Sequence, residues 1–143
     1  MNNRLQSQVD YLFVYGTLQH QWRQRNSFLV RGELQQIAHL LDMHGEYLAP
    51  ATTTGNLYTN GRYPALVLTS NAQIVHGELW QIPSELWPQL DLYEGIGSEF
   101  AEPQEYHRTH ITVTTDHGIP TKAWSYLYQW DLADWRTLFN GRF

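Results

Sequence analysis

The stretch DYLFVYGTLQHQW, residues 10–22, decides the fold and raises the first question about function. Its first half carries apolar side chains on both alternating faces, which is typical of a strand buried on both sides in the middle of a sheet. The pattern then breaks at a glycine, and polar residues follow. A strand that ends this way leaves successive backbone N–H groups free to bind an anion, here those of Tyr15, Gly16, Thr17 and Leu18. The sequence therefore predicts a central strand that ends either in an ordinary strand-to-loop glycine, which is the commoner case, or in a loop that accepts a carboxylate or a phosphate.

Composition points to one compact domain over residues 1–143. Hydrophobic residues make up 42% of the chain and charged residues only 16%, which excludes a disordered protein. The net charge is −5 and the nine basic residues are scattered, so neither nucleic acid nor an anionic membrane surface is an expected partner. The first residues lack the apolar core of a signal peptide, and no apolar run approaches the ~20 residues of a membrane span. We expect a cytoplasmic protein.

The absence of cysteine narrows the chemistry. With no cysteine in the chain, disulfides, thiolate nucleophiles and cysteine-based zinc sites are excluded. Seven histidines remain, but their best metal-like pairing is His76 with Glu78, two residues apart on one predicted strand face. Ordinary surface or hydrogen-bonded histidines account for this spacing better. We predict neither a metal site nor a cofactor.

The periodicity of the remaining chain predicts an α+β fold. Strands and helices do not alternate regularly, and a small, partly closed β-barrel would remove exposed sheet edges. Turn residues separate the predicted strands, and glycines follow two of the predicted helices. We expect strands over 9–18, 51–58, 63–68, 74–82, 109–115 and 123–130, and helices from 26 or 27 to 44, over 86–94 and over 132–139.

The stretch LDLYEGIG, residues 90–97, places a carboxylate at the end of a predicted helix. Glu94 follows Leu90 by four residues and Trp87 by seven, which puts it at the edge of the apolar stripe. Partial burial and the negative end of the helix dipole both raise the pKa of a carboxyl group. A raised pKa suits a general base. The plain alternative is a solvated glutamate in a frayed helical turn.

The last predicted strand gathers four aromatic side chains, Trp124, Tyr126, Tyr128 and Trp130, on one face. Such a face can stack against sugars. Large aromatic residues more often serve burial, so we favour core packing.

Seven segments, taken in order, resemble the gamma-glutamylcyclotransferase-like superfamily, and in particular its AIG2-like branch of gamma-glutamylamine cyclotransferases and BtrG-type enzymes. The resemblance runs from about residue 11 to residue 130. It implies a small mixed β-barrel with helices packed around it and a pocket near the YGTL loop. The segments are FVYGTL, GEYLAPATTTGNLY, YPALVL, VHGELWQIP, LDLYEG, YHR and AWSYLY.

The resemblance implies a cofactor-independent enzyme that cyclises a γ-glutamyl amine or peptide to 5-oxoproline and releases the free amine. It assigns Glu94 as general acid/base and the loop of residues 15–18 to the α-amino acid end of the substrate. Tyr126 is the pocket tyrosine, with Tyr128 as the alternative. The ten residues from Ile96 to Glu105 form a longer insertion than compact members carry, so the identity of the released amine does not transfer.

Two other functions stay open. A binding protein of the same fold would hold an amino-acid derivative without turning it over. A carbohydrate-binding domain would use the aromatic face of the last strand. The expected partner is a small molecule, and the sequence leaves the oligomeric state open.

Overall fold

The computed structural model describes residues 8–69 and 72–143. None of the helices in these ranges has the length and apolar character that crossing a membrane requires. The elements are β1 (Val9–Val14), α1 (His20–Arg25), η2 (Ser27–Leu29), α2 (Gly32–His44), β2 (Glu46–Thr59), β3 (Pro64–Val67), β4 (Gln73–Pro83), η3 (Ser84–Leu86), α3 (Trp87–Tyr93), β5 (Tyr106–Thr115), β6 (Pro120–Tyr128) and β7 (Arg136–Thr137).

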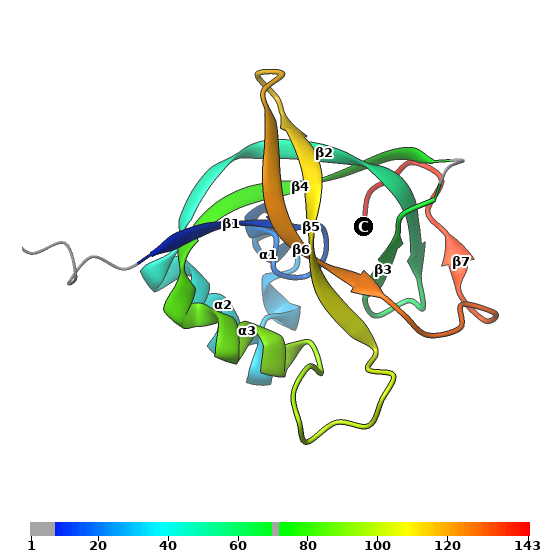
Figure 1. The fold of residues 1–143 in the computed structure, drawn as a ribbon, viewed down its shortest axis with the longest axis horizontal. Helices are drawn as coiled ribbons and strands as arrows, with labels where there is room; N and C mark the ends of the chain where they lie inside the picture. Colours follow the sequence, from blue (N-terminus) through cyan, green and yellow to red (C-terminus); the bar gives the residue numbers. More distant parts are fainter. Residues whose placement is uncertain (1–7, 70–71) are drawn as a thin grey trace, which may run out of the picture.

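Five strands close into a mixed barrel, as Figure 1 shows. The order is β2-β4-β1-β6-β5, and β5 pairs back with β2 to complete the ring. The β1–β6 pair is parallel and the other pairs are antiparallel. Strands β3 and β7 extend β2 outside the ring. The predicted α+β class and small mixed barrel are confirmed.

Strand β1 occupies the central place that its sequence predicts. It lies between β4 and β6, and Leu12, Phe13 and Val14 are at most 5% exposed. Gly77 on β4 allows this close packing, since a Cβ at that position would lie 2.3 Å from the carbonyl oxygen of Val14. The end of β1, where the YGTL loop begins, therefore depends on a glycine in the neighbouring strand.

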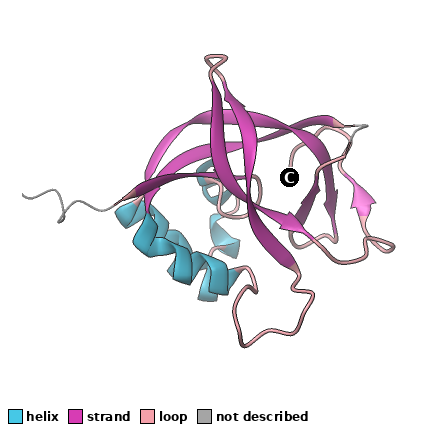
Figure 2. Cartoon of the chain, viewed as in Figure 1, coloured by secondary structure: helices cyan, strands magenta, loops and turns pink. Residues whose placement is uncertain are grey.

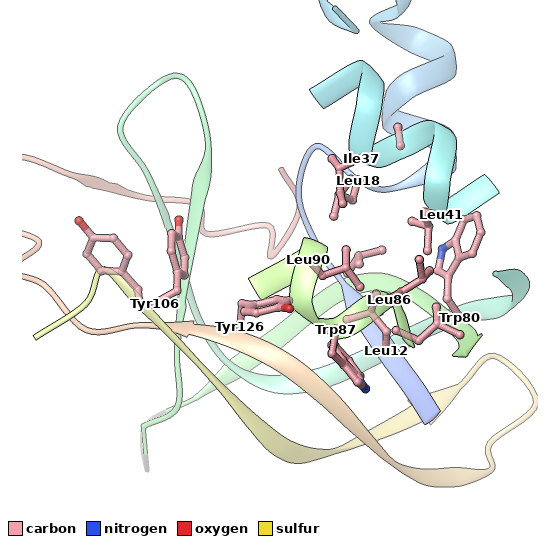
Figure 3. Close-up of a cluster of buried hydrophobic side chains, with 14 of the residues drawn as sticks. Leu12, Leu18, Ile37, Leu41, Trp80, Leu86, Trp87, Leu90, Tyr106 and Tyr126 are labelled. Atoms are coloured by element: carbon pink, nitrogen blue, oxygen red, sulfur yellow. The ribbon is translucent and has the colours of Figure 1, made fainter. Parts of the chain in front are cut away.

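Two buried clusters divide the faces of the barrel. Phe13 and Tyr15 belong to the cluster that strand side chains form inside the barrel, together with Leu57, Val75 and Val113. The second cluster packs the helices onto the outside of the barrel, and Figure 3 shows part of it. All three α-helices gather on one side of the barrel (Figure 2). Members of the outer cluster include Leu12, Leu41, Trp80, Ile82, Leu86 and Leu90.

Two predicted boundaries in the first third of the chain are wrong. Strand β1 ends at Val14 rather than Leu18, because the chain turns there and the N–H of Gln19 donates to the carbonyl of Gly16 at 3.1 Å. The helix predicted from residue 26 or 27 is split into η2 and α2, since Arg31 has extended backbone. The predicted end at His44 is confirmed, and Gly45 follows it.

The helix predicted over 132–139 is also wrong. Residues Arg136 and Thr137 form β7 instead, and the N–H of Leu138 donates to the carbonyl of Leu57 at 2.7 Å. The free edge of β2 supplies hydrogen-bond partners that a helix would have made within itself. Trp135 packs on Tyr63 and Tyr128, so its burial requires no helix.

Candidate active site

One cavity of about 1450 Å³ collects the residues that the sequence singles out. It lies between the loop after β1, the end of α3, the β2–β3 hairpin and the loop of residues 96–105. All six predicted site residues line its wall, namely Tyr15, Gly16, Thr17, Leu18, Glu94 and Tyr126. Segments almost 80 residues apart in sequence thus meet at one place.

The YGTL loop presents free backbone donors. The N–H groups of Gly16, Thr17 and Leu18 make no hydrogen bond to any residue within 8–69 or 72–143. Buried or half-buried N–H groups normally have partners, so three successive free ones are suited to binding an anionic group of a ligand. A Cβ on Gly16 would lie 2.7 Å from the ring of Pro64, so this glycine also allows the β2–β3 hairpin to pack against the loop.

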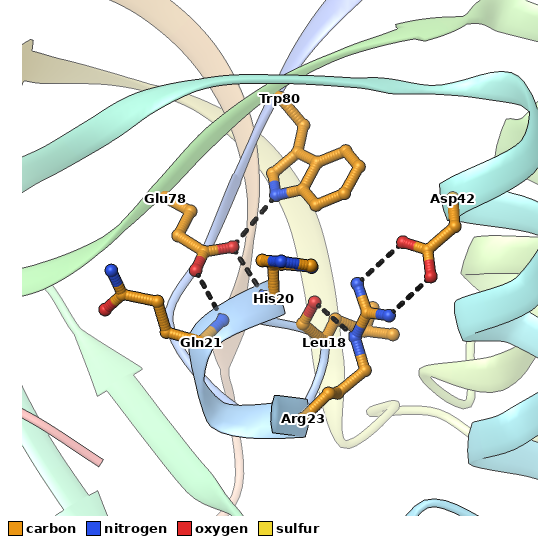
Figure 4. Close-up of polar contacts among 7 residues, drawn as sticks. All are labelled: Leu18, His20, Gln21, Arg23, Asp42, Glu78 and Trp80. Carbon is orange, nitrogen blue, oxygen red and sulfur yellow. Dashed lines mark hydrogen bonds and ion pairs between the residues drawn. The ribbon is translucent and has the colours of Figure 1, made fainter. Parts of the chain in front are cut away.

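A buried carboxylate holds the other end of this loop in place. The carboxylate of Glu78, on β4, accepts the N–H of His20 at 2.7 Å and the N–H of Gln21 at 3.0 Å, and also the indole N–H of Trp80 (Figure 4). Glu78 is 3% exposed. Its negative charge lies at the N-terminus of α1, where free N–H groups favour an anion. Glu78 therefore anchors the helix that follows the loop.

Glu94 lies at the C-terminal end of α3, as predicted, and its side chain opens onto the cavity. No described residue donates a hydrogen bond to its carboxylate within 8–69 and 72–143. Burial, followed by the negative charges of Glu105 and Asp91, raises the pKa of Glu94 to about 8. A carboxyl group with this pKa exchanges its proton near neutral pH, as a general acid/base must.

A network of charged and aromatic groups fixes α3 against the barrel. Arg108 on β5 donates to both carboxylate oxygens of Asp91, at 2.9 and 3.2 Å. Its guanidinium lies 4.2 Å from the ring centre of Trp87 and 4.8 Å from that of Trp124. The hydroxyl of Tyr126 donates to the same carboxylate at 2.7 Å. Because Asp91 lies three residues before Glu94, the network holds in place the last turn of α3, which leads to Glu94.

The tyrosine hydroxyls around Glu94 are protonated donors with assigned partners. Burial is the main cause of the raised pKa of Tyr15, Tyr106 and Tyr126, and the charge of Glu94 adds to it in each case. Tyr15 donates to the carbonyl of Tyr126, and Tyr106 donates to the carbonyl of Pro64 at 2.7 Å. These hydroxyls thus hold the cavity wall together.

The aromatic face of β6 is mostly packed within the fold. Tyr126 and Tyr128 are buried, and Trp124 lies against Arg108 and the ring of His110. Trp130 lies beyond the end of the strand and is 47% exposed. Little of the face is left as a platform for a sugar.

Three residues of the site escaped the sequence prediction. Asp91 lies in the segment LDLYEG and Arg108 in the segment YHR, but nothing in either segment indicates that the two residues pair. Glu105 ends the 96–105 loop and accepts a hydrogen bond from the hydroxyl of Tyr63, in the β2–β3 hairpin, at 2.6 Å. Each of these contacts joins residues from different elements, so the sequence around either partner carries no local signal of it.

Known proteins match this chain along nearly its whole length. A family model described as gamma-glutamyl cyclotransferase, AIG2-like, matches residues 12–141. A Vibrio cholerae protein named "Putative gamma-glutamylcyclotransferase" is 34% identical over 120 residues, which are 82% of this chain and 81% of that protein.

Two solved structures share the fold. An AIG2-like protein from Mus musculus superposes with a TM-score of 0.67 at 16% identity, covering 94% of this chain and 88% of that one. YkqA from Bacillus subtilis gives a TM-score of 0.66 at 22% identity, covering 95% of this chain but only 40% of YkqA. These two likenesses show the fold, while the family model and the Vibrio cholerae relative show that the chain belongs to the gamma-glutamyl cyclotransferase, AIG2-like family.

Proposed function

We propose that this protein cyclises a γ-glutamyl amine or peptide to 5-oxoproline and releases the attached amine, with Glu94 as general acid/base. One observation carries the proposal: among residues 8–69 and 72–143, the carboxyl group of Glu94 receives no hydrogen bond, and it lines the same cavity as three N–H groups that donate none. The first is equipped to move protons and the second to hold a carboxylate. Family membership gives this pairing its substrate class.

Substrate positioning falls to the YGTL loop. The N–H groups of Gly16, Thr17 and Leu18 bind the α-carboxylate of the γ-glutamyl group, and the adjacent α-ammonium then points toward Glu94. The reaction is intramolecular and closes a five-membered ring, so holding the substrate folded supplies much of the rate enhancement. Glu78 contributes indirectly by anchoring α1 and with it the end of the loop.

Glu94 carries one proton through the reaction. As a carboxylate it takes a proton from the α-ammonium, and the freed amine attacks the γ-carbonyl carbon to form the new carbon–nitrogen bond. The protonated Glu94 then gives this proton to the departing nitrogen as the old carbon–nitrogen bond breaks. The attacking nitrogen becomes positively charged when the new bond forms, and it releases its second proton to water before the old bond breaks. The carboxylate of Glu94 is restored, and the products are 5-oxoproline and a free amine.

A panel of γ-glutamyl amines and dipeptides tests the proposal. Mass spectrometry is expected to detect 5-oxoproline and the matching free amine in equal amounts from at least one member. Saturable binding of panel members without any 5-oxoproline would instead support the binding protein of the same fold.

The rate should depend on pH through Glu94. The base must be ionised in the free enzyme, and its pKa is raised to about 8, so kcat/KM is expected to fall about tenfold per pH unit below pH 8. Glu105→Gln removes a negative charge that raises this pKa, so it should move the acidic limb to lower pH. Initial rates of 5-oxoproline release at constant ionic strength measure both profiles. A limb near the ordinary glutamate pKa in the wild type would contradict the assignment.

A further inference from the structure

The wall of the cavity exposes apolar side chains from three separate elements. Leu29 of η2 is 43% exposed, Leu92 of α3 is 51% exposed, and Phe100 of the 96–105 loop is 38% exposed, and all three line the cavity. Single exposed apolar residues need no explanation, but a group on the wall of one cavity marks a surface that a ligand covers. The wall continues directly to Glu94 and the YGTL loop.

The size of the cavity leaves room beyond the reacting group. Its volume of about 1450 Å³ exceeds the 300–1,000 Å³ that is usual for small-molecule pockets. A γ-glutamyl group held by the loop would occupy only the part of the cavity beside the loop and Glu94. The rest is then available to whatever is attached to the γ-carbonyl, which is the amine that departs.

The charges on the wall do not favour a charged arm. Arg62 and Arg136 lie on the side of the β2–β3 hairpin, while Glu33 and Glu105 lie on α2 and on the insertion. An arm carrying either charge would meet a like charge on one of these sides and an opposite charge on the other, so the charges give no net preference, and desolvating a charged arm would cost free energy. An apolar arm meets Leu29, Leu92 and Phe100 without this cost.

We infer that the substrates are γ-glutamyl amides whose departing amine carries an apolar arm, which packs on Leu29, Leu92 and Phe100. The inference rests on the proposed function, because the arm belongs to the amine that the reaction releases. Each methylene that leaves water for this wall should improve binding about two- to fourfold.

Glutaryl amides test the arm separately from the chemistry. They lack the α-amine, so they cannot cyclise, but they keep the carboxylate, the γ-carbonyl and the arm. Calorimetry with the wild-type protein compares the glutaryl methyl-, butyl- and hexylamides. We expect Kd to fall about two- to fourfold per added methylene. The glutaryl amides of 4-aminobutylamine and of 4-aminobutyrate supply charged arms of similar length and should bind less tightly than the butylamide.

Variants of exposed apolar residues test where the arm of the glutaryl amide binds. Phe100→Ala should flatten the dependence of Kd on arm length, and so should Leu92→Ser. Phe28→Ala is the matched control, because Phe28 is 73% exposed and does not line the cavity, and it should keep the full dependence.

Three results would overturn the inference. Kd could be independent of arm length, either charged arm could bind more tightly than the butylamide, or no glutaryl amide could bind at all. The same arms on γ-glutamyl amides are assayed for 5-oxoproline. Length-dependent binding without 5-oxoproline would leave the apolar subsite in place and reject the proposed reaction, so the two ideas fail separately.

Discussion

Glu94→Gln is expected to lower 5-oxoproline formation about 10³-fold while the protein still folds. The amide has the shape of the carboxyl group but can neither take the proton of the α-ammonium nor return it to the leaving nitrogen. Folding should survive because no residue of the described ranges depends on the carboxylate as a hydrogen-bond acceptor. Single-turnover mass spectrometry of 5-oxoproline, beside a thermal melt, measures both effects.

Glu99→Gln is the matched control for this variant. Glu99 is an exposed carboxylate on the loop that follows Glu94, and it does not line the cavity, so its loss should leave the rate unchanged. A Glu94→Gln protein that keeps more than about a tenth of wild-type activity would reject the assignment, since general acid–base groups contribute far more than this.

Glu94→Gln should also change how the stability of the protein depends on pH. Folding raises the pKa of Glu94 from 4.5 to about 8, so the folded protein holds this proton more tightly than the unfolded chain. The resulting stabilisation is complete below the unfolded pKa and is lost as pH rises through about 8. Glutamine carries no such proton. As pH rises from 4.5 to about 8, the melting temperature of the wild type should therefore fall relative to that of Glu94→Gln.

Gly77→Ala is expected to destabilise the protein by about 3 kcal/mol or more. The new Cβ would lie 2.3 Å from the carbonyl oxygen of Val14 and 2.7 Å from the ring of Phe13, so β1 and β4 must separate. For a chain of this size, the loss corresponds to a fall in melting temperature of roughly 10 °C. Because Val14 precedes the YGTL loop, any protein that still folds should bind glutaryl amides more weakly.

Gly118→Ala separates this effect from a general cost of replacing glycine. Gly118 has a φ of 80° at the β5–β6 turn, and a Cβ there would meet nothing within 4 Å. Only the backbone conformation is then strained, at a cost of about 1 kcal/mol. Equal losses for the two alanines in urea denaturation would show that the contact between β1 and β4 is not the cause.

The local sequence predicts well where the central strand and two of the helices lie. The two-sided apolar pattern of β1 and the stop at Gly45 after α2 both depend on residues close in sequence. The stop is confirmed, and the burial of β1 is confirmed from Leu12 to Val14, whereas Val9 and Tyr11 are exposed. Glu94 is likewise predicted at the end of a helix and lies there. The spacing of apolar residues and the capping residues depend on positions a few residues apart, so both can be recognised in one amino-acid sequence.

Local sequence misleads where a distant partner competes. Leu132 and Trp135 repeat at helical spacing, but the free edge of β2 takes the backbone of residues 136–138 into strand pairing. At residue 31 the chain is extended although an apolar helical pattern continues through it. Helix propensity contributes little free energy in both places, and tertiary hydrogen bonding or packing outweighs it.

The sequence by itself determined the buried central strand, the free loop after it, the helix that ends at Glu94 and, through the order of its segments, the family. Only the tertiary structure decided that Arg108 pairs with Asp91, that Glu78 anchors α1, and that Glu105 lies close enough to influence Glu94. The reason is physical: these interactions join residues 17, 58 and 11 positions apart, and barrel closure, which brings them together, leaves no local period in the chain.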